Sequence, residues 1–231
     1  MDSAEQKILD LNILLLGRPQ AGKSATGNTI LGSVEFLSRL SPAAVTQECR
    51  LCCKTFPGFL RRQGCELALR LRVLDTPAYP SCLVSSEQVK QDIMASAERA
   101  FVTGPHVVVL VLRADVPFCK EDWQLIQLAE DILGPSWRNH SLLILSHYDR
   151  VDRAKIRGEE YLRLAPEALQ ALLESVEHRY HFLDNSKEWL QREGRLLMDK
   201  IFNIARKNKY ETLPFSTNST NLGKSMTSVS E

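Results

Sequence analysis

The chain alternates short, almost entirely apolar runs with longer segments in which apolar residues recur every three or four positions. The apolar runs are Ile13–Leu16, Val107–Leu112 and Ser141–Leu145. Such runs are typical of parallel strands whose two faces are both covered by helices. The helical spacing predicts helices over residues 24–31, 87–101, 121–133, 167–177 and 187–207. In the last helix we expect the core to be met by Trp189, Leu190, Leu196, Leu197, Ile201 and Ile204.

Three further segments complete the predicted sheet. Thr46–Phe56 has strand composition and Glu66–Leu74 alternates apolar and polar residues, so we expect the two to pair as an antiparallel hairpin. Arg179–Leu183 predicts a short last strand. The whole pattern predicts an α/β fold with three layers around a six-stranded, mostly parallel sheet that carries this hairpin at one edge. We expect one domain over residues 8–210, an N-terminal extension over 1–7 and a disordered Ser/Thr/Asn-rich tail over 211–231.

Charge and cysteine content narrow the class of protein. Lys and Arg number 29 against 28 Asp and Glu, a net charge of +1, so no nucleic-acid-binding surface is indicated. A secretory signal, a membrane-spanning run and a prenylation cysteine are not evident, and we expect a cytoplasmic protein without a transmembrane anchor. Reduced cysteines are then expected. The spacing Cys49-x-x-Cys52-Cys53, with Cys65, leaves zinc as an alternative to buried thiols, although no second such pair lies at a matching interval.

A glycine loop follows the first apolar run. Residues 17–24 read Gly-Arg-Pro-Gln-Ala-Gly-Lys-Ser, the G-x-x-x-x-G-K-[ST] pattern between a strand and a helix that is typical of a P-loop. Gly17 and Gly22 allow turns that aim backbone N–H groups at phosphates. Lys23 would neutralise the β and γ phosphates, and the Ser24 hydroxyl would bind Mg²⁺. The alternative, a plain glycine turn, is less favoured by this strand-loop-helix setting.

Two more side chains are candidates for the metal site. Asp75 ends the predicted strand Glu66–Leu74 and begins Asp-Thr-Pro, so its carboxylate could hold Mg²⁺ through a water; a turn-capping aspartate is the alternative. Thr46 stands where a switch threonine could reach the metal when a γ-phosphate is present. The hydroxyls of Ser38, Ser41 and Thr29 compete with Thr46 for that role.

The residues that recognise the nucleotide base are expected after the strand Ser141–Leu145. Residues 146–149 read Ser-His-Tyr-Asp, a variant of the [NT]-K-x-D tetrad of GTPases. Asp149 would accept hydrogen bonds from the guanine N1–H and 2-amino group, and adenine would leave this carboxylate unpaired. His147 would stack over the purine, or it is a loop histidine without a ligand. Asn185 offers an amide to the guanine O6, although the same residues suit a turn into the last helix.

At this point a family resemblance becomes specific. Residues 17–32, Gly-Arg-Pro-Gln-Ala-Gly-Lys-Ser-Ala-Thr-Gly-Asn-Thr-Ile-Leu-Gly, closely resemble the signature of the AIG1/GIMAP family of immune-associated GTP-binding proteins. Phe36-x-Ser38, Val45-Thr46-x-x-Cys49, Val73–Pro77 and Phe182-x-x-Asn185 are similar to that family as well. Residues 113–119 and the short length resemble its single-domain members.

The resemblance implies a P-loop NTPase G domain that binds GTP or GDP with Mg²⁺ and self-associates, as a homo- or hetero-oligomer, through its nucleotide face. By position it assigns phosphate binding to Gly17, Arg18, Pro19, Gln20, Ala21, Gly22, Lys23, Ser24, Ala25 and Ser38. It assigns the guanine site to Ser146, His147, Tyr148 and Asn185, beside Asp149.

Several departures from the family pattern concern hydrolysis. Ala78 stands where the family has the glycine of D-T-P-G, and the next residue is Tyr79, so no glutamine orients a water there. Pro117 occupies the place where many relatives have an arginine, and Ser146 and His147 replace common Arg and Lys. We therefore expect nucleotide-dependent switching or assembly with slow or partner-stimulated hydrolysis. A GTPase completed by a dimer partner and a nucleotide-binding scaffold without significant hydrolysis are the alternatives.

Overall fold

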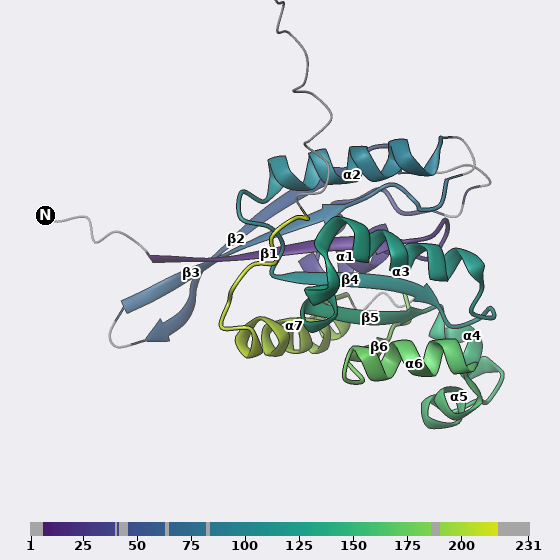
Figure 1. Cartoon of the computed structure of the whole chain (residues 1–231). Helices are drawn as coiled ribbons and strands as arrows, with labels where there is room; N and C mark the ends of the chain where they lie inside the picture. Colours follow the sequence, from purple (N-terminus) through teal and green to yellow (C-terminus); the bar gives the residue numbers. More distant parts are fainter. Residues whose placement is uncertain are drawn as a thin grey trace, which may run out of the picture.

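A six-stranded sheet forms the centre of the protein in the computed structural model, which describes residues 7–39, 41, 46–62, 65–81, 84–185 and 190–216. The strands are β1 (Lys7–Gly17), β2 (Arg50–Arg62), β3 (Cys65–Asp75), β4 (Val107–Arg113), β5 (Ser141–Ser146) and β6 (Tyr180–Phe182). Their order is β2-β3-β1-β4-β5-β6 (Figure 1), and every neighbouring pair is parallel except the antiparallel β2–β3 hairpin. The predicted fold class is confirmed.

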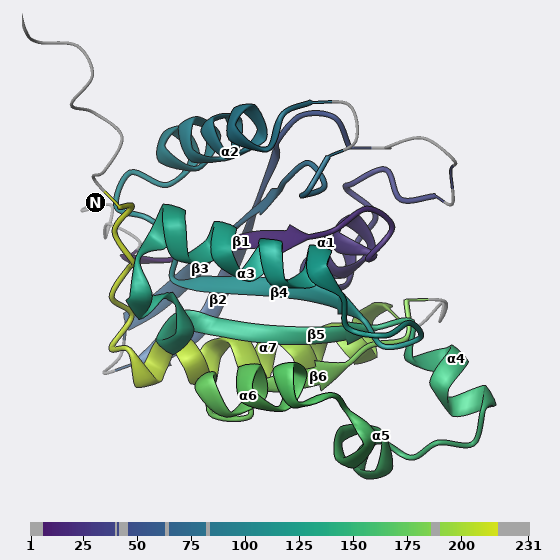
Figure 2. The same cartoon turned by 45° about the vertical axis from the view of Figure 1, so that its right-hand side comes forward.

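Helices cover both faces of this sheet (Figure 2). They are α1 (Lys23–Leu31), α2 (Ser86–Ala100), α3 (Lys120–Leu133), the 3₁₀ helix η1 (Pro135–His140), α4 (Tyr148–Arg153), α5 (Gly158–Leu164), α6 (Glu167–Ser175) and α7 (Leu190–Lys207). Buried side chains of α2, α3 and α6 share one core cluster, and those of α1 and α7 share the other. Because β1, β4 and β5 are covered on both faces, their apolar runs are continuous rather than alternating. Because these three strands are parallel, their carboxyl ends lie together along the same side of the sheet.

Four elements differ from the sequence-based expectation. The strand β2 continues through Pro57 and Gly58 to Arg62 and absorbs them in a register shift between Phe56 and Leu60. Proline has no backbone N–H, and an edge strand tolerates it because one side of that strand has no neighbour that needs a hydrogen bond. The short helices α4 and α5 and the 3₁₀ helix η1 were not predicted, since each is at most seven residues long and buries too few side chains to give a helical period.

The closing helix and the segment after it refine the predicted domain. Leu197, Ile201 and Ile204 are buried as expected, but Leu196 is 49% exposed and that part of the prediction is wrong, because it lies off the stripe of the other three. Residues 211–216, placed in the tail by the prediction, pack on the domain: Leu213 is buried and its N–H donates to Pro105 O at 2.8 Å. Lys7, the last residue of the predicted extension over 1–7, begins β1. Residues 1–6 and 217–231, Trp189 and the side chain of Leu190 lie outside the described part.

No helix in the described part of the chain combines the length and the apolar composition needed to cross a membrane.

Candidate functional site

The loop between β1 and α1 has the backbone that a phosphate-binding loop requires. Gly22 has φ +85°, in the left-handed region that favours glycine. At Gly17 an added Cβ would lie 2.9 Å from the carbonyl oxygen of Val111, so β4 passes too close for any side chain. The helix α1 begins directly after Gly22, so its unpaired first-turn N–H groups open toward the loop. Both predicted glycines are therefore required by the local geometry.

The Lys23 side chain is held inside this loop. It is 7% exposed, and its Nζ donates to Arg18 O at 3.4 Å. Burial lowers the pKa of Lys23 to about 8, and the nearby Asp75 carboxylate opposes that shift. A desolvated ammonium with one long hydrogen bond to a carbonyl is a site that an anion would stabilise.

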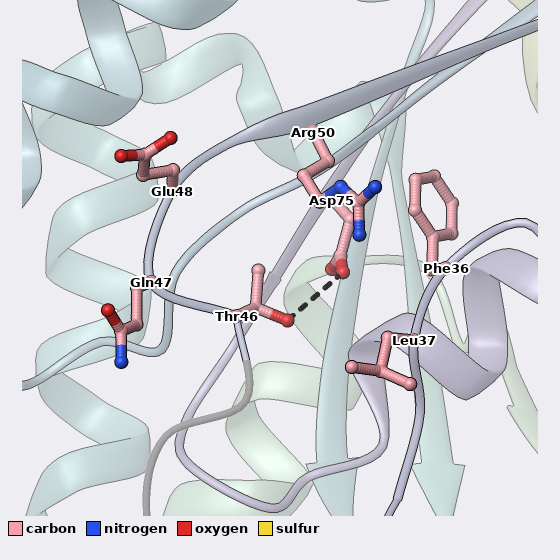
Figure 3. A pocket seen from close by; sticks show the side chains of 7 residues that line it. All are labelled: Phe36, Leu37, Thr46, Gln47, Glu48, Arg50 and Asp75. Atoms are coloured by element: carbon pink, nitrogen blue, oxygen red, sulfur yellow. Dashed lines mark hydrogen bonds between the residues drawn. The ribbon is translucent and has the colours of Figure 1, made fainter.

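The three predicted metal ligands lie together next to Lys23. Ser24 Oγ donates to Asp75 Oδ2 at 2.6 Å and lies 3.1 Å from Thr46 Oγ1. Figure 3 shows the third contact, in which Thr46 Oγ1 lies 3.5 Å from Asp75 Oδ2. Asp75 is 1% exposed, and its Oδ1 is buried without a hydrogen-bond partner among the described residues. Burial raises the pKa of Asp75, and the Ser24 hydroxyl and Lys23 oppose this rise. We call Lys23, Ser24, Thr46 and Asp75 the metal end.

This donor set fits Mg²⁺. Two hydroxyl oxygens and a carboxylate are hard ligands of the kind that Mg²⁺ takes, and the unpartnered Oδ1 of Asp75 leaves acceptor capacity free at the same point. Bound between Ser24, Thr46 and the phosphates, the ion would neutralise negative charge on the phosphate oxygens.

Other residues assigned to phosphate binding have different surroundings. The Arg18 side chain turns away from the loop interior: its Nη1 donates to Cys119 Sγ at 3.0 Å and its Nε lies 3.2 Å from Asp122 Oδ1. Only the backbone of Arg18 is then available to a phosphate. Gln20 Nε2 donates to Ser41 O. Ser38 is exposed after α1, and no hydrogen bond joins it to the described residues of the loop.

The strand end of β5 supports the glycine loop. Ser146 is fully buried, and its hydroxyl lies 2.7 Å from Ala21 O and 3.0 Å from Leu112 O, both carbonyl acceptors. The single hydroxyl proton is therefore shared between the loop and β4. Ser146, assigned to the guanine site by resemblance, has the geometry of a support for the loop rather than of a group that faces a ligand.

The next three residues are the N-cap His147 and the first two residues of α4. His147 has φ +56°, and its Nε2 donates to Gln20 O at 3.1 Å, because a carbonyl can only accept. Tyr148 packs on Phe182 with ring centroids 4.4 Å apart. The Asp149 carboxylate is mostly buried and forms an ion pair of 3.3 Å with the exposed Arg153 one turn later. Asp149 is thus held by a partner that solvent can replace.

Asn185 lies over the glycine loop. Its Nδ2 stands 2.8 Å from the position of a Cβ added at Gly22, so any side chain there would collide with it. Both polar atoms of the Asn185 amide are buried without a hydrogen-bond partner among the described residues. Buried amides are normally paired, so this one is prepared for a ligand. We call His147, Asp149 and Asn185 the base end; no hydrogen bond joins any two of them.

Two functional contacts were not identified from the sequence. Asn28 on α1 fixes the chain that follows it: its Oδ1 accepts from the N–H groups of Glu35 and Phe36, and its Nδ2 donates to Phe36 O. The Phe36 ring lies where a Cβ of Gly27 would be, at 2.8 Å. The Gly27-Asn28 pair in the family signature was the only sequence signal for this contact. The second contact joins Arg18 to Cys119 and Asp122 and so connects the loop to the start of α3. No local sequence pattern predicts this contact.

The segment after Asp75 is bound to β1. Thr76 Oγ1 donates to Leu15 O at 2.7 Å, and the Tyr79 N–H donates to Gly17 O at 3.2 Å. The Tyr79 ring packs on the core cluster of α2 and α3. An aromatic ring held in this way supplies neither the amide nor the carboxylate that would orient an attacking water.

Similar proteins share sequence with most of this chain. Immune-associated nucleotide-binding protein 7 of Arabidopsis thaliana is 27% identical over 75% of this chain and 53% of its own length. GTPase IMAP family member 8 of Mus musculus is 29% identical over 83% of this chain and 26% of its own. This chain therefore spans only about half, or about a quarter, of those relatives.

Solved structures agree on the fold. A dimerization-deficient mutant of Toc33 from Arabidopsis thaliana has a TM-score of 0.63 at 16% identity, with 90% of this chain and 88% of that one covered. Toc33 in complex with GDP and Mg²⁺ has a TM-score of 0.60 at 18% identity over the same shares. The model of the AIG1 family matches residues 11–228, and the chain belongs to the AIG1 family.

Proposed function

We propose that this protein binds GTP and GDP with Mg²⁺ in the site between β1, β3 and β5. The observation that carries the proposal is the metal end, in which Ser24, Thr46 and Asp75 lie within 3.5 Å of one another next to the buried Lys23. A turn-capping aspartate would not require a threonine hydroxyl from another loop beside it. The complexes of Toc33 with GDP and Mg²⁺ and with GMPPNP and Mg²⁺, on the same fold, support this proposal.

Guanine is the proposed base. Asp149 would accept from N1–H and the 2-amino group, and the Asn185 amide, unpartnered among the described residues and buried, would donate to O6. Adenine would leave the Asp149 carboxylate without its donors, at a cost of about 1–3 kcal/mol. His147 would lie against the purine from its place beside Gln20.

The nucleotide is proposed to act through switching or self-assembly, with slow or partner-stimulated hydrolysis. Thr46, in the loop after α1, lies within hydrogen-bond distance of both Ser24 of α1 and Asp75 of β3, so a change at the phosphates would be transmitted to that loop. Dimerization is important for the GTPase activity of the chloroplast translocon components atToc33 and psToc159, which supports self-association through the nucleotide face here.

Free thiols at Cys49, Cys52, Cys53 and Cys119 fit the cytoplasm as the proposed compartment.

A nucleotide-binding scaffold without significant hydrolysis is the second candidate. The observation that favours it is Tyr79, whose ring is packed on the core and whose N–H is bound to Gly17 O. No group at this position would position a water, and a missing arginine finger alone can remove ~10³ or more in rate.

Calorimetry with GTP, GDP and ATP, each with and without Mg²⁺, tests the proposal. We expect GTP and GDP to bind with at least about tenfold preference over ATP, and Mg²⁺ to strengthen GTP binding. No binding of guanine nucleotides at millimolar concentration would refute it, and equal binding of ATP would refute the role of Asp149.

Single-turnover hydrolysis, measured against protein concentration, then separates the two candidates. A steep rise in rate with concentration indicates a GTPase completed by a second copy, and a rate near that of free GTP indicates the scaffold.

A further inference from the structure

Arg50 is an exposed cation beside the metal end that none of the roles above uses. It is the first residue of β2, and the antiparallel register pairs it directly with Asp75, the last residue of β3. Residues opposite each other in an antiparallel pair have Cβ atoms about 5 Å apart on the same face of the sheet. The sheet itself therefore fixes Arg50 beside the proposed metal ligand.

A cavity of about 280 Å³ lies between the loop after α1 and the start of β2. It is lined by Phe36, Leu37, Thr46, Gln47, Glu48, Arg50 and Asp75. Figure 3 shows the Arg50 guanidinium reaching toward the Asp75 carboxylate from the side opposite Thr46, whereas the Glu48 side chain points away from both. Among the described residues, Arg50 forms no ion pair within 4 Å, so its charge is not committed to another carboxylate.

The charges around Asp75 change when nucleotide and metal bind. Without them, the positive charges of Lys23 and Arg50 both act on the Asp75 carboxylate and partly balance its negative charge. With Mg²⁺ held near Ser24, Thr46 and Asp75, Arg50 would face a divalent cation of its own sign. The Asp75 carboxylate offsets part of that repulsion, and a further anion at this end would offset more of it. The γ-phosphate is such an anion: GTP brings it to the metal, and GDP does not.

We propose that Arg50 is the residue with which this chain distinguishes a nucleoside triphosphate from a diphosphate. It is a specificity-determining cation supplied in cis, placed by the β2–β3 register. The inference rests on the proposed function, because it assumes that the phosphates lie over Lys23. It makes Arg50 favourable when the γ-phosphate is present and unfavourable, beside Mg²⁺ alone, when it is absent.

The test is calorimetry on the full chain with GDP and with a non-hydrolysable GTP analogue, at saturating Mg²⁺, for the native protein, Arg50→Gln and Arg50→Lys. Arg72→Gln is the matched control, since it removes the same charge from the same hairpin three residues before Asp75. We expect Arg50→Gln to weaken the analogue about tenfold, equivalent to about 1.4 kcal/mol, and to leave GDP unchanged or tighter. Arg50→Lys restores part of the preference, and Arg72→Gln leaves it unchanged.

Comparison of the two nucleotides separates this role from a structural one. If Arg50 only balances Asp75, Arg50→Gln changes the affinities for both nucleotides by the same factor, and that result would overturn the inference. An equal loss in Arg72→Gln would also overturn it, because a general field of positive charge would then suffice. Failure of the native protein to bind either nucleotide is a different result, which refutes the proposed function itself.

Discussion

The metal end and the base end of the site differ in how complete they are before any ligand binds. At the metal end, Ser24, Thr46 and Asp75 come from three separate segments and already bond to one another. At the base end, Asp149 is paired with Arg153 on its own helix, and the Asn185 amide has no partner among the described residues. Under the proposed function, the phosphate half is preorganised, and the base half would exchange or acquire partners when the purine enters.

This difference predicts how affinity and selectivity are divided. Preorganised groups lose little entropy when they bind a ligand, so most of the affinity should come from the phosphates. Groups that change partners contribute less net free energy, yet they penalise a wrong base through unpaired polar atoms. The metal end should therefore govern how tightly nucleotides bind, and the base end which nucleotide is chosen.

The largest effect is expected from Lys23→Ala. It removes the buried ammonium of the metal end, and Arg18, the other cation of the loop, cannot replace it because its side chain is committed to Asp122. We expect affinity for GTP and GDP to fall at least hundredfold, about 3 kcal/mol or more, measured by calorimetry, with an unchanged circular dichroism spectrum. Lys155→Gln, at an exposed position, is the control. A loss below tenfold would show that the loop amides suffice and that the metal end is not the main source of affinity.

Asp149→Asn is expected to change selectivity more than affinity for phosphates. The amide no longer accepts from both the guanine N1–H and 2-amino group, whereas it donates to the 2-carbonyl oxygen of xanthine. We expect GTP to weaken by about tenfold to hundredfold and xanthosine triphosphate to gain. Competition binding measures both, and Asp152→Asn, exposed on the same helix, is the control. An unchanged ratio of guanine to xanthine affinity would contradict the assignment of the base end.

Asn185→Ala separates function from stability. A buried amide loses its hydration on folding, and without hydrogen bonds nothing compensates for that loss. Its removal should therefore leave the nucleotide-free Tm unchanged or higher. Affinity for GDP should nevertheless fall by roughly tenfold, since the bond to O6 is lost. A lower Tm with unchanged GDP affinity would show that Asn185 is a support for the glycine loop at Gly22.

Much of the metal end followed from the sequence because its residues occupy ends of elements. Lys23 and Ser24 begin a helix after a glycine loop, and Asp75 ends a strand, so a parallel sheet brings them to one edge. Arg50 could not be recognised in this way. Its place depends on the register of β2 with β3, and the sequence suggested that the strand began at Thr46 and ended at Phe56 rather than running from Arg50 to Arg62.

The base end was harder because its contacts depend on side-chain choices within short loops. The tetrad at 146–149 located the candidate site. Ser146 and His147, however, donate hydrogen bonds to carbonyl groups of the glycine loop, and no hydrophobic period or sequence motif predicts either contact. The tie from Arg18 to Asp122 joins residues far apart in the chain and likewise leaves no sequence signal. Long-range pairs of this kind arise from packing the two layers, which local patterns do not specify.

The smallest effect is expected from Arg153→Gln, and it tests most directly whether the base end is held by a weak partner. Arg153 is 74% exposed, so its ion pair with Asp149 is screened by water and salt and contributes little. Releasing Asp149 should therefore change GTP affinity by less than about twofold. The same titration at low and high salt should show the native protein approaching the variant as salt rises. A tenfold gain in Arg153→Gln would mean that the pair closes the base end strongly, and that Asp149 is withheld from the purine rather than available to it.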